Sequence, residues 1–191
     1  MTIDERSAVV DNDFAGHLAD SKLNDARLIE LLNIAFSKSE LTAVMHPLVY
    51  EKELLKTNRR IMLLFQALIF QKAEFNDIFQ NDSGKRTYYI LMVKELYKAL
   101  TGKVLDASGD KVLSHWVRKS SLGEVHSLSM CLVCNCGIFL SDDSDSKKIQ
   151  DYIENKLLVK LNVYDRTEFL DERLQDEASR SERRSLTHIA K

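Results

Sequence analysis

Acidic side chains follow short apolar segments at two places that are far apart in the chain. Asp11 comes directly after Ser7–Val10, and Asp142 and Asp143 come shortly after Ile138–Leu140. Each apolar segment has the length and composition of a buried strand. In an open parallel α/β sheet, ligands bind at the carboxyl ends of the strands. We therefore expect these three aspartates to lie at one edge of a sheet.

Two glutamates are expected to face the same edge from the starts of helices. Glu51 lies one turn inside the helix that Pro47 is predicted to begin, because proline is favoured at the first helical position. Glu124 stands at the start of a helix that ends in a tight turn near residues 135–137. Without a counterion, such carboxylates repel one another and their pKa values rise. Mg²⁺ or Mn²⁺ would relieve this repulsion, because hard oxygen ligands suit these ions.

The elements that must position these residues alternate along the chain. We predict strands at residues 7–10, 41–45, 138–140 and 159–164, and helices at residues 25–36, from 47, at 86–100, from 122 and at 146–155. Residues 59–79 fit one long helix or a helix followed by a short strand near 68–75, and we prefer the second interpretation. This order predicts an α/β fold, a three-layer sandwich around a central, mostly parallel sheet with a helix-rich insert.

Composition limits the domain organisation and the class of partner. A chain of 191 residues that is 45% hydrophobic can bury a full core. We assign residues 1–170 to the α/β domain and residues 171–191, which are rich in charge, to a C-terminal tail or helix that is a candidate contact for a protein partner. The net charge of −2 predicts no general affinity for polyanions, so nucleic acid would require a local basic strip or a bridging metal.

Other features of the sequence bear on location and assembly. We find no apolar run of membrane-spanning length and no signal peptide, and the three clustered cysteines suggest reduced thiols; together these predict a cytoplasmic protein without a membrane partner. Cys131, Cys134 and Cys136 lack a second ligand cluster, so small buried hydrophobes explain them better than zinc does. The helix at 86–100 has apolar surface that serves either a homodimer or the core.

The acidic residues also have plainer explanations. Ser121 and Glu124 form the S-x-x-E pattern of a capping box at a helix start. Asp142 and Asp143 are suited to cap the helix that follows them. Taken singly, each residue is better explained by these local roles. The predicted convergence of four acidic positions on one sheet edge favours a functional site.

Four short motifs resemble those of the PIN-domain nucleases. They are VVDND near the N-terminus, HPLVYEKELL after the second strand, GEVHSLSM at a helix start and FLSDD at a strand end. The resemblance covers roughly residues 7–170 and implies divalent-metal-dependent cleavage of single-stranded RNA or flap-like nucleic acid. It implies that Asp11, Glu51, Glu124 and Asp142 are the catalytic acids, with Asp143 as a supplementary or alternative metal ligand.

The same resemblance suggests how the site would act. Metal ions held by Asp11, Glu124 and Asp142 would activate a water and clamp the scissile phosphate. Glu51 and Asp143 would complete the ligand set, directly or through water. Positive charge gathers just before Glu124, where Arg118 and Lys119 are candidates to neutralise a neighbouring phosphate. A plainer account of residues 104–119 is an exposed connecting segment.

Two rival functions remain open at this stage. Val9-Val10-Asp11-Asn12-Asp13 also resembles the nucleophile motif of haloacid-dehalogenase-type phosphohydrolases, in which Asp11 would attack phosphate and Asp13 would act as the acid. Phe14 follows Asp13, however, where that family usually has threonine or valine. The non-enzymatic alternative is an inactive PIN-like module that binds a protein or nucleic acid through its charged tail or basic strip.

Overall fold

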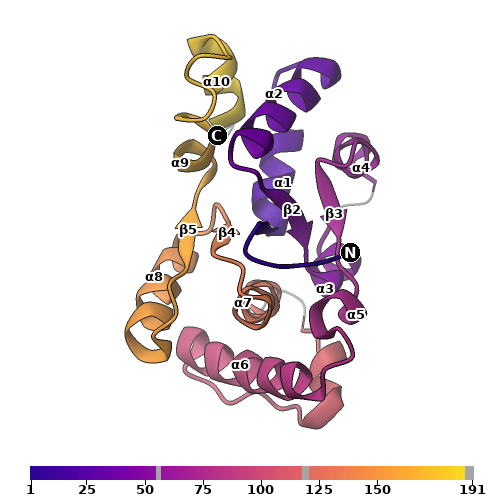
Figure 1. The fold of residues 1–191 in the computed structure, drawn as a ribbon, viewed down its shortest axis with the longest axis vertical. Helices are drawn as coiled ribbons and strands as arrows, with labels where there is room; N and C mark the ends of the chain where they lie inside the picture. The colour runs from indigo at the N-terminus through magenta and orange to yellow at the C-terminus, as the bar shows by residue number, and fades with distance from the viewer. Residues whose placement is uncertain (55–56, 118–120, 188–191) are drawn as a thin grey trace.

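The computed structural model describes residues 1–54, 57–117 and 121–187, and within them a parallel sheet forms the centre of the molecule (Figure 1). The sheet has five strands in the order β3-β2-β1-β4-β5. They are β1 (Ser7–Val10), β2 (Thr42–Met45), β3 (Phe70–Lys72), β4 (Ile138–Leu140) and β5 (Asn162–Tyr164). All neighbouring strands run parallel, with Val9 aligned to Val44 on one side and to Phe139 on the other. The predicted α/β fold with a parallel central sheet is confirmed.

Helices connect the strands and cover both faces of the sheet. Those in the first half are α1 (Asn12–Ala19), α2 (Asp25–Lys38), α3 (Pro47–Lys52), α4 (Arg59–Gln66) and α5 (Phe75–Phe79). Those in the second half are α6 (Ser83–Thr101), α7 (Leu122–Cys134), α8 (Ser144–Tyr152), α9 (Arg166–Leu170) and α10 (Arg180–Thr187). A 3₁₀ segment spans Gly109–Ser114, and α8 continues as a π-helical turn over Ile153–Leu157.

The alternation of side chains along β1 divides the core into two layers. Ala8 and Val10 pack with the helices α1, α2 and α4, whereas Val9 packs with α6 and α7. All three side chains are fully buried, as a strand covered on both faces requires. Figure 1 shows α6 and α7 on one side of the strands and α2 and α10 on the other, which completes a three-layer sandwich.

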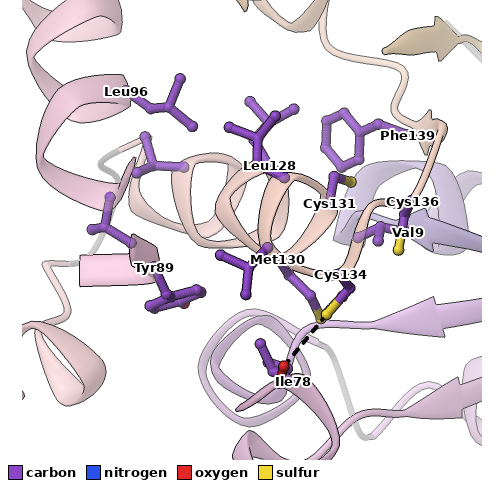
Figure 2. Close-up of a cluster of buried hydrophobic side chains, with 14 of the residues drawn as sticks. Val9, Ile78, Tyr89, Leu96, Leu128, Met130, Cys131, Cys134, Cys136 and Phe139 are labelled. Atoms are coloured by element: carbon purple, nitrogen blue, oxygen red, sulfur yellow. Dashed lines mark hydrogen bonds between the residues drawn. The ribbon is translucent and has the colours of Figure 1, made fainter. Parts of the chain in front are cut away.

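Helix α7 is buried over nearly all of its residues. Figure 2 shows how its C-terminal end places Cys131 and Cys134, with Cys136 just beyond, beside Val9 and Phe139. The three thiols are free and buried, and burial raises the pKa of Cys131 well above its usual range. The thiol of Cys134 contacts the carbonyl oxygen of Ile78 at 3.7 Å. These contacts agree with the interpretation of the cysteines as small core side chains.

Hydrogen bonds between buried rings hold α3, α6 and α7 together. His46 Nδ1 accepts from the backbone N–H of Leu48 at 3.2 Å, so its hydrogen is on Nε2 and is donated to Tyr89 Oη at 2.8 Å. Tyr89 in turn donates to His126 Nδ1 at 2.6 Å, and His126 Nε2 faces the His115 carbonyl oxygen at 3.4 Å. Burial lowers the pKa of His126 to about 4 and that of His46 well below its usual value. Both rings therefore stay neutral.

Several predicted boundaries differ from the structure for local reasons. Residues 59–79 form α4, then β3 and then the short helix α5, and the left-handed conformation of Leu68 (φ 57°) separates α4 from β3. The last strand begins at Asn162 and is shorter than predicted, and Leu158 ends the preceding π-helical turn in a left-handed conformation (φ 56°). Helix α6 begins at Ser83 because Asp82 caps it, and it ends at Gly102 as predicted.

The charged C-terminal segment packs against the α/β domain. Leu174, Ala178 and Leu186 are buried in the core layer formed with α1 and α2. Arg27 of α2 donates to Glu182 of α10 at 2.7 Å. Residues 171–187 are therefore folded onto the domain, where the sequence had suggested a tail or a helix. Within the described ranges, no helix is long and apolar enough to cross a lipid bilayer.

Candidate active site

An acidic cleft of about 520 Å³ opens at the carboxyl edge of the sheet, beyond β1 and β4. Its lining comes from segments that are distant in sequence: Asp11, Asn12, Asp13, Glu53, Ser121, Glu124 and Asp143. Parallel pairing explains the convergence, because the backbone N–H of Asp11 donates to the Leu140 carbonyl at 3.0 Å and so extends the ladder between the two strands. The lining contains five carboxylates and neither lysine nor arginine among the described residues.

Asp11 has a buried carboxylate whose hydrogen-bond partners are all uncharged. It caps α1 by accepting from the backbone N–H of Phe14 at 2.8 Å, and its second oxygen accepts from the Ser141 hydroxyl. Burial raises the pKa of Asp11 well above its usual value, and the neighbouring Asp13 and Asp142 raise it further. The two hydrogen bonds oppose this rise but do not cancel it. Asp11 thus both caps α1 and lines the cleft.

Glu53 enters the cleft from the end of α3 and lies directly against Gly123. A Cβ atom at position 123 would lie 2.4 Å from Glu53 Oε1 and 2.5 Å from Oε2, so only glycine allows this approach. Burial raises the pKa of Glu53 to about 7, with further contributions from Asp13 and Glu124. Gly123 therefore leaves room for the Glu53 carboxylate, and the adjacent Glu124 supplies a second carboxylate to the cleft.

Glu124 is joined to Asp11 through two serine hydroxyls. Ser146 Oγ lies 2.6 Å from Glu124 Oε1 and 2.9 Å from Ser141 Oγ, while Ser141 Oγ donates to Asp11. Ser146 and Ser141 therefore link the two acids through their hydroxyl groups. Burial raises the pKa of Glu124 to about 7 and that of Asp11 well above its usual value.

The two aspartates after β4 have different environments. Asp143 lines the cleft and caps α8 by accepting from the backbone N–H of Asp145 at 2.9 Å. Asp142 does not line the cleft. Its carboxylate accepts from the guanidinium and the backbone N–H of Arg166 and lies 2.7 Å from His17 Nδ1. The predicted metal ligand Asp142 is therefore part of a buried ion pair, and Asp143 is the residue that the cleft contains.

Glu51 also lies outside the cleft. It is exposed, and its carboxylate pairs with Lys72 Nζ of β3 at 3.0 Å. The short helix α3 ends at Lys52, so the acid that turns into the cleft is Glu53, two residues later. The correct position could have been suspected from the same acidic motif, but its orientation depends on where the helix ends.

Two further expectations concern the segment before Glu124. The predicted capping box is not formed, because the Ser121 side chain makes no capping hydrogen bond and Glu124 instead accepts from Ser146. The predicted phosphate contacts Arg118 and Lys119 lie outside the described residues. Ser141 and Ser146 were missed from the sequence, since serines after a strand and in a helix start are also ordinary turn and capping residues.

The cleft has ligands suited to a hard divalent cation, although they are not preassembled. Across residues 1–54, 57–117 and 121–187, no three acidic, histidine or cysteine side chains are grouped closely enough to hold a metal ion as they stand. The donors are nevertheless carboxylate oxygens, and the partly buried Glu53 and Glu124 have raised pKa values that a nearby cation would lower. The chemistry of the lining therefore fits Mg²⁺ or Mn²⁺.

Comparison of the chain with protein-family models, with curated proteins and with solved structures finds no match.

Proposed function

We propose that this protein is a divalent-metal-dependent nuclease that hydrolyses phosphodiester bonds in the acidic cleft. The observation that carries the proposal is the convergence of Asp11, Asp13, Glu53, Glu124 and Asp143 on one cleft at the carboxyl edge of a parallel sheet. Asp11 is buried and Glu53 and Glu124 are partly buried with no lysine or arginine in the described lining, and this unfavourable environment raises the pKa of Glu53 and of Glu124 to about 7. A function that explains this arrangement is binding of a divalent cation, which in turn binds an anionic substrate.

Within this proposal, Asp11, Glu124 and Asp143 would hold Mg²⁺ or Mn²⁺, with Glu53 and Asp13 completing or orienting the set. When bound, the cation supplies positive charge for the scissile phosphate and promotes ionisation of the attacking water. Phe14 N–H and Ser141 fix the orientation of Asp11, and Ser146 fixes that of Glu124. These contacts hold the acids ready before any ligand arrives.

The resemblance to PIN-domain nucleases supports RNA as the substrate. The VVDND motif contributes Asp11 and Asp13, the GEVHSLSM motif contributes Glu124, and the FLSDD motif contributes Asp143. The acid from HPLVYEKELL is Glu53 where the resemblance had suggested Glu51. We accordingly propose single-stranded RNA as the substrate class.

Cleavage of a labelled single-stranded RNA by the purified protein, with Mn²⁺ or with EDTA, tests the proposal. We expect cleavage with Mn²⁺, none with EDTA, and a loss of at least about a thousandfold in Asp11→Asn and Glu124→Gln, since a lost acid removes both charge and ligand. Asp110→Asn, which changes an exposed carboxylate paired with Arg86, is the matched control and should retain full activity. Undiminished activity of Asp11→Asn would contradict the assignment.

A phosphohydrolase with Asp11 as nucleophile is the second candidate, because Asp11 and Asp13 line the same cleft. Against it, the described lining contains no lysine to balance a phosphoryl group. Acid quenching of turnovers with ³²P-labelled phosphate esters separates the two functions. A labelled Asp11 would favour the phosphohydrolase, and the nuclease proposal expects none. RNA binding that persists in the acidic variants, without cleavage by the wild type, would favour a binding module.

A further inference from the structure

A second, oppositely charged hollow lies between α9 and α10. It encloses about 290 Å³ and is lined by Thr167, Asp171, Arg180, Arg183, Arg184 and Thr187, which we call the arginine groove. Three guanidinium groups and one carboxylate give it a formal charge of +2. In a chain whose net charge is −2, this is a local concentration of cationic side chains.

The arginines of the groove divide into one that is fixed and two that are available. Arg183 pairs with Asp171 at 2.8 Å and donates to the carbonyl oxygens of Gln175 and Ala178, so it holds the segment before α10 in place. Arg180 and Arg184 are exposed, and neither guanidinium group has a hydrogen bond or ion pair with another described residue. Exposed guanidinium groups of this kind can pair bidentately with phosphate oxygens.

The groove is structurally connected to the acidic cleft. Asp143 lines the cleft, and the adjacent Asp142 accepts from Arg166 at the start of α9. Arg166 Nη1 donates to the Leu186 carbonyl oxygen at 2.9 Å, and Leu186 precedes Thr187 of the groove. The buried Leu186 side chain and the Arg27–Glu182 pair keep α10 seated on the domain. The groove is therefore a fixed surface that this chain of contacts through Arg166 joins to the cleft.

We propose that the arginine groove binds backbone phosphates of the nucleic-acid strand whose scissile phosphate enters the acidic cleft. This inference rests on the proposed function. An acidic cleft repels a polyanion, so affinity for the strand must come from cations outside it. The groove meets this requirement with the exposed guanidinium groups of Arg180 and Arg184. A backbone contact of this type carries no sequence information and positions the strand.

The test compares the Arg180→Gln/Arg184→Gln variant with wild type in two assays. The first is fluorescence anisotropy with a labelled single-stranded RNA 20-mer in Ca²⁺ or EDTA at several salt concentrations. The second is Mn²⁺-dependent hydrolysis of bis(p-nitrophenyl) phosphate, which is too small to reach the groove. We expect at least tenfold weaker RNA binding and a slope of log K against log salt that is smaller by about 1.4, for two lost phosphate contacts. Hydrolysis of the small ester should be unchanged.

The matched control is Lys98→Gln/Lys103→Gln, which removes the same charge near the end of α6, on the far side of the molecule from α10 (Figure 1). It should bind RNA as wild type does. RNA binding by the arginine variant equal to that of this control overturns the groove proposal. The groove proposal is also overturned if the wild type binds poly-glutamate as tightly as RNA and both interactions require Arg180 and Arg184. That result would favour an acidic protein partner.

The outcomes for the groove and for the nuclease can be told apart. A wild type that hydrolyses neither RNA nor the small ester contradicts the proposed function. In that case, RNA binding that still depends on the two arginines supports the groove as a nucleic-acid site, and RNA binding that does not depend on them overturns it.

Discussion

Asp11 and Asp142 occupy nearly equivalent places yet have opposite environments. Both follow adjacent parallel strands, and both are largely buried, with 9% of Asp11 and 7% of the Asp142 side chain exposed. Asp142 is met by the guanidinium of Arg166 and the ring of His17. Asp11 is met only by a hydroxyl, a backbone amide and other acids. Asp142, a largely buried acid with its own cation, is therefore structural, whereas Asp11, a buried acid without one among the described residues, is a candidate for function.

The largest effect is expected when the cation that pairs with Asp142 is removed. Arg166→Met should lower the free energy of unfolding by about 3–5 kcal/mol, because it leaves a buried carboxylate unpaired and removes the bond to the Leu186 carbonyl. Urea denaturation followed by circular dichroism measures the change. Asp142→Asn/Arg166→Met should be less destabilised than Arg166→Met alone, and an equal or larger loss in the double variant would contradict a charge-based explanation.

The free energy of unfolding should depend on pH because the acids of the cleft have no lysine or arginine in its described lining. The pKa values of Glu53 and Glu124 are about 7 in the folded protein, against 4.5 for a glutamate in the unfolded chain. The folded state therefore binds these protons more tightly than the unfolded state does. Their stabilising contribution is complete below pH 4.5 and is lost as the pH rises to about 7. With EDTA present, we expect a loss on the order of 1 kcal/mol per group, reduced by partial exposure. Glu124→Gln should flatten the profile, and a stability that rises over this range would contradict it.

Gly123→Ala tests whether the position of Glu53 matters within the cleft. The new methyl group would occupy the place of the Glu53 carboxylate, which must rotate away because it is the flexible end of its side chain. We expect about tenfold weaker Mn²⁺ affinity or activity with the fold retained. Calorimetric titration with Mn²⁺ measures the change. Gly16→Ala, where a Cβ meets nothing within 4 Å, is the control, and equal behaviour of the two variants would show that the close approach is unimportant.

The smallest effect is expected for Asp11→Asn on stability. Asparagine keeps an oxygen to accept from the backbone N–H of Phe14 and removes a charge that burial disfavours. The free energy of unfolding at pH 8 should therefore be unchanged or higher by about 1 kcal/mol. The identical change Asp142→Asn should destabilise, since it leaves Arg166 without a charged partner. Destabilisation of similar size in both variants would remove the distinction between the two acids.

The sequence predicts the architecture better than it predicts the orientation of individual acids. The short apolar runs that end at Asp11 and Asp142 are sufficient to predict parallel strands sharing an edge, and the helix that Gly102 ends is equally clear. The choice between Asp142 and Asp143 depends on Arg166, which reaches Asp142 only after β5 has joined the sheet. No local pattern specifies such a contact.

The sequence pointed to Glu51, whereas Glu53 lines the cleft, and the reason is related. Helical periodicity counted from Pro47 applies only as far as Lys52, where α3 ends. Beyond that point the direction of Glu53 is set by packing against Gly123, which is seventy residues away in sequence. A glycine immediately before an acid was the one signal in the sequence that could have suggested a close approach at this place.

The hydrogen-bonded rings of His46, Tyr89 and His126 connect the helices that carry Glu53 and Glu124. Because the pKa of His126 is about 4 and that of His46 is lower than its usual range, neither ring gains a proton near neutrality. The two glutamates, with pKa values of about 7, change charge in that very interval. The rings that hold these helices together therefore keep one charge state over the interval in which the two glutamates gain and lose their protons.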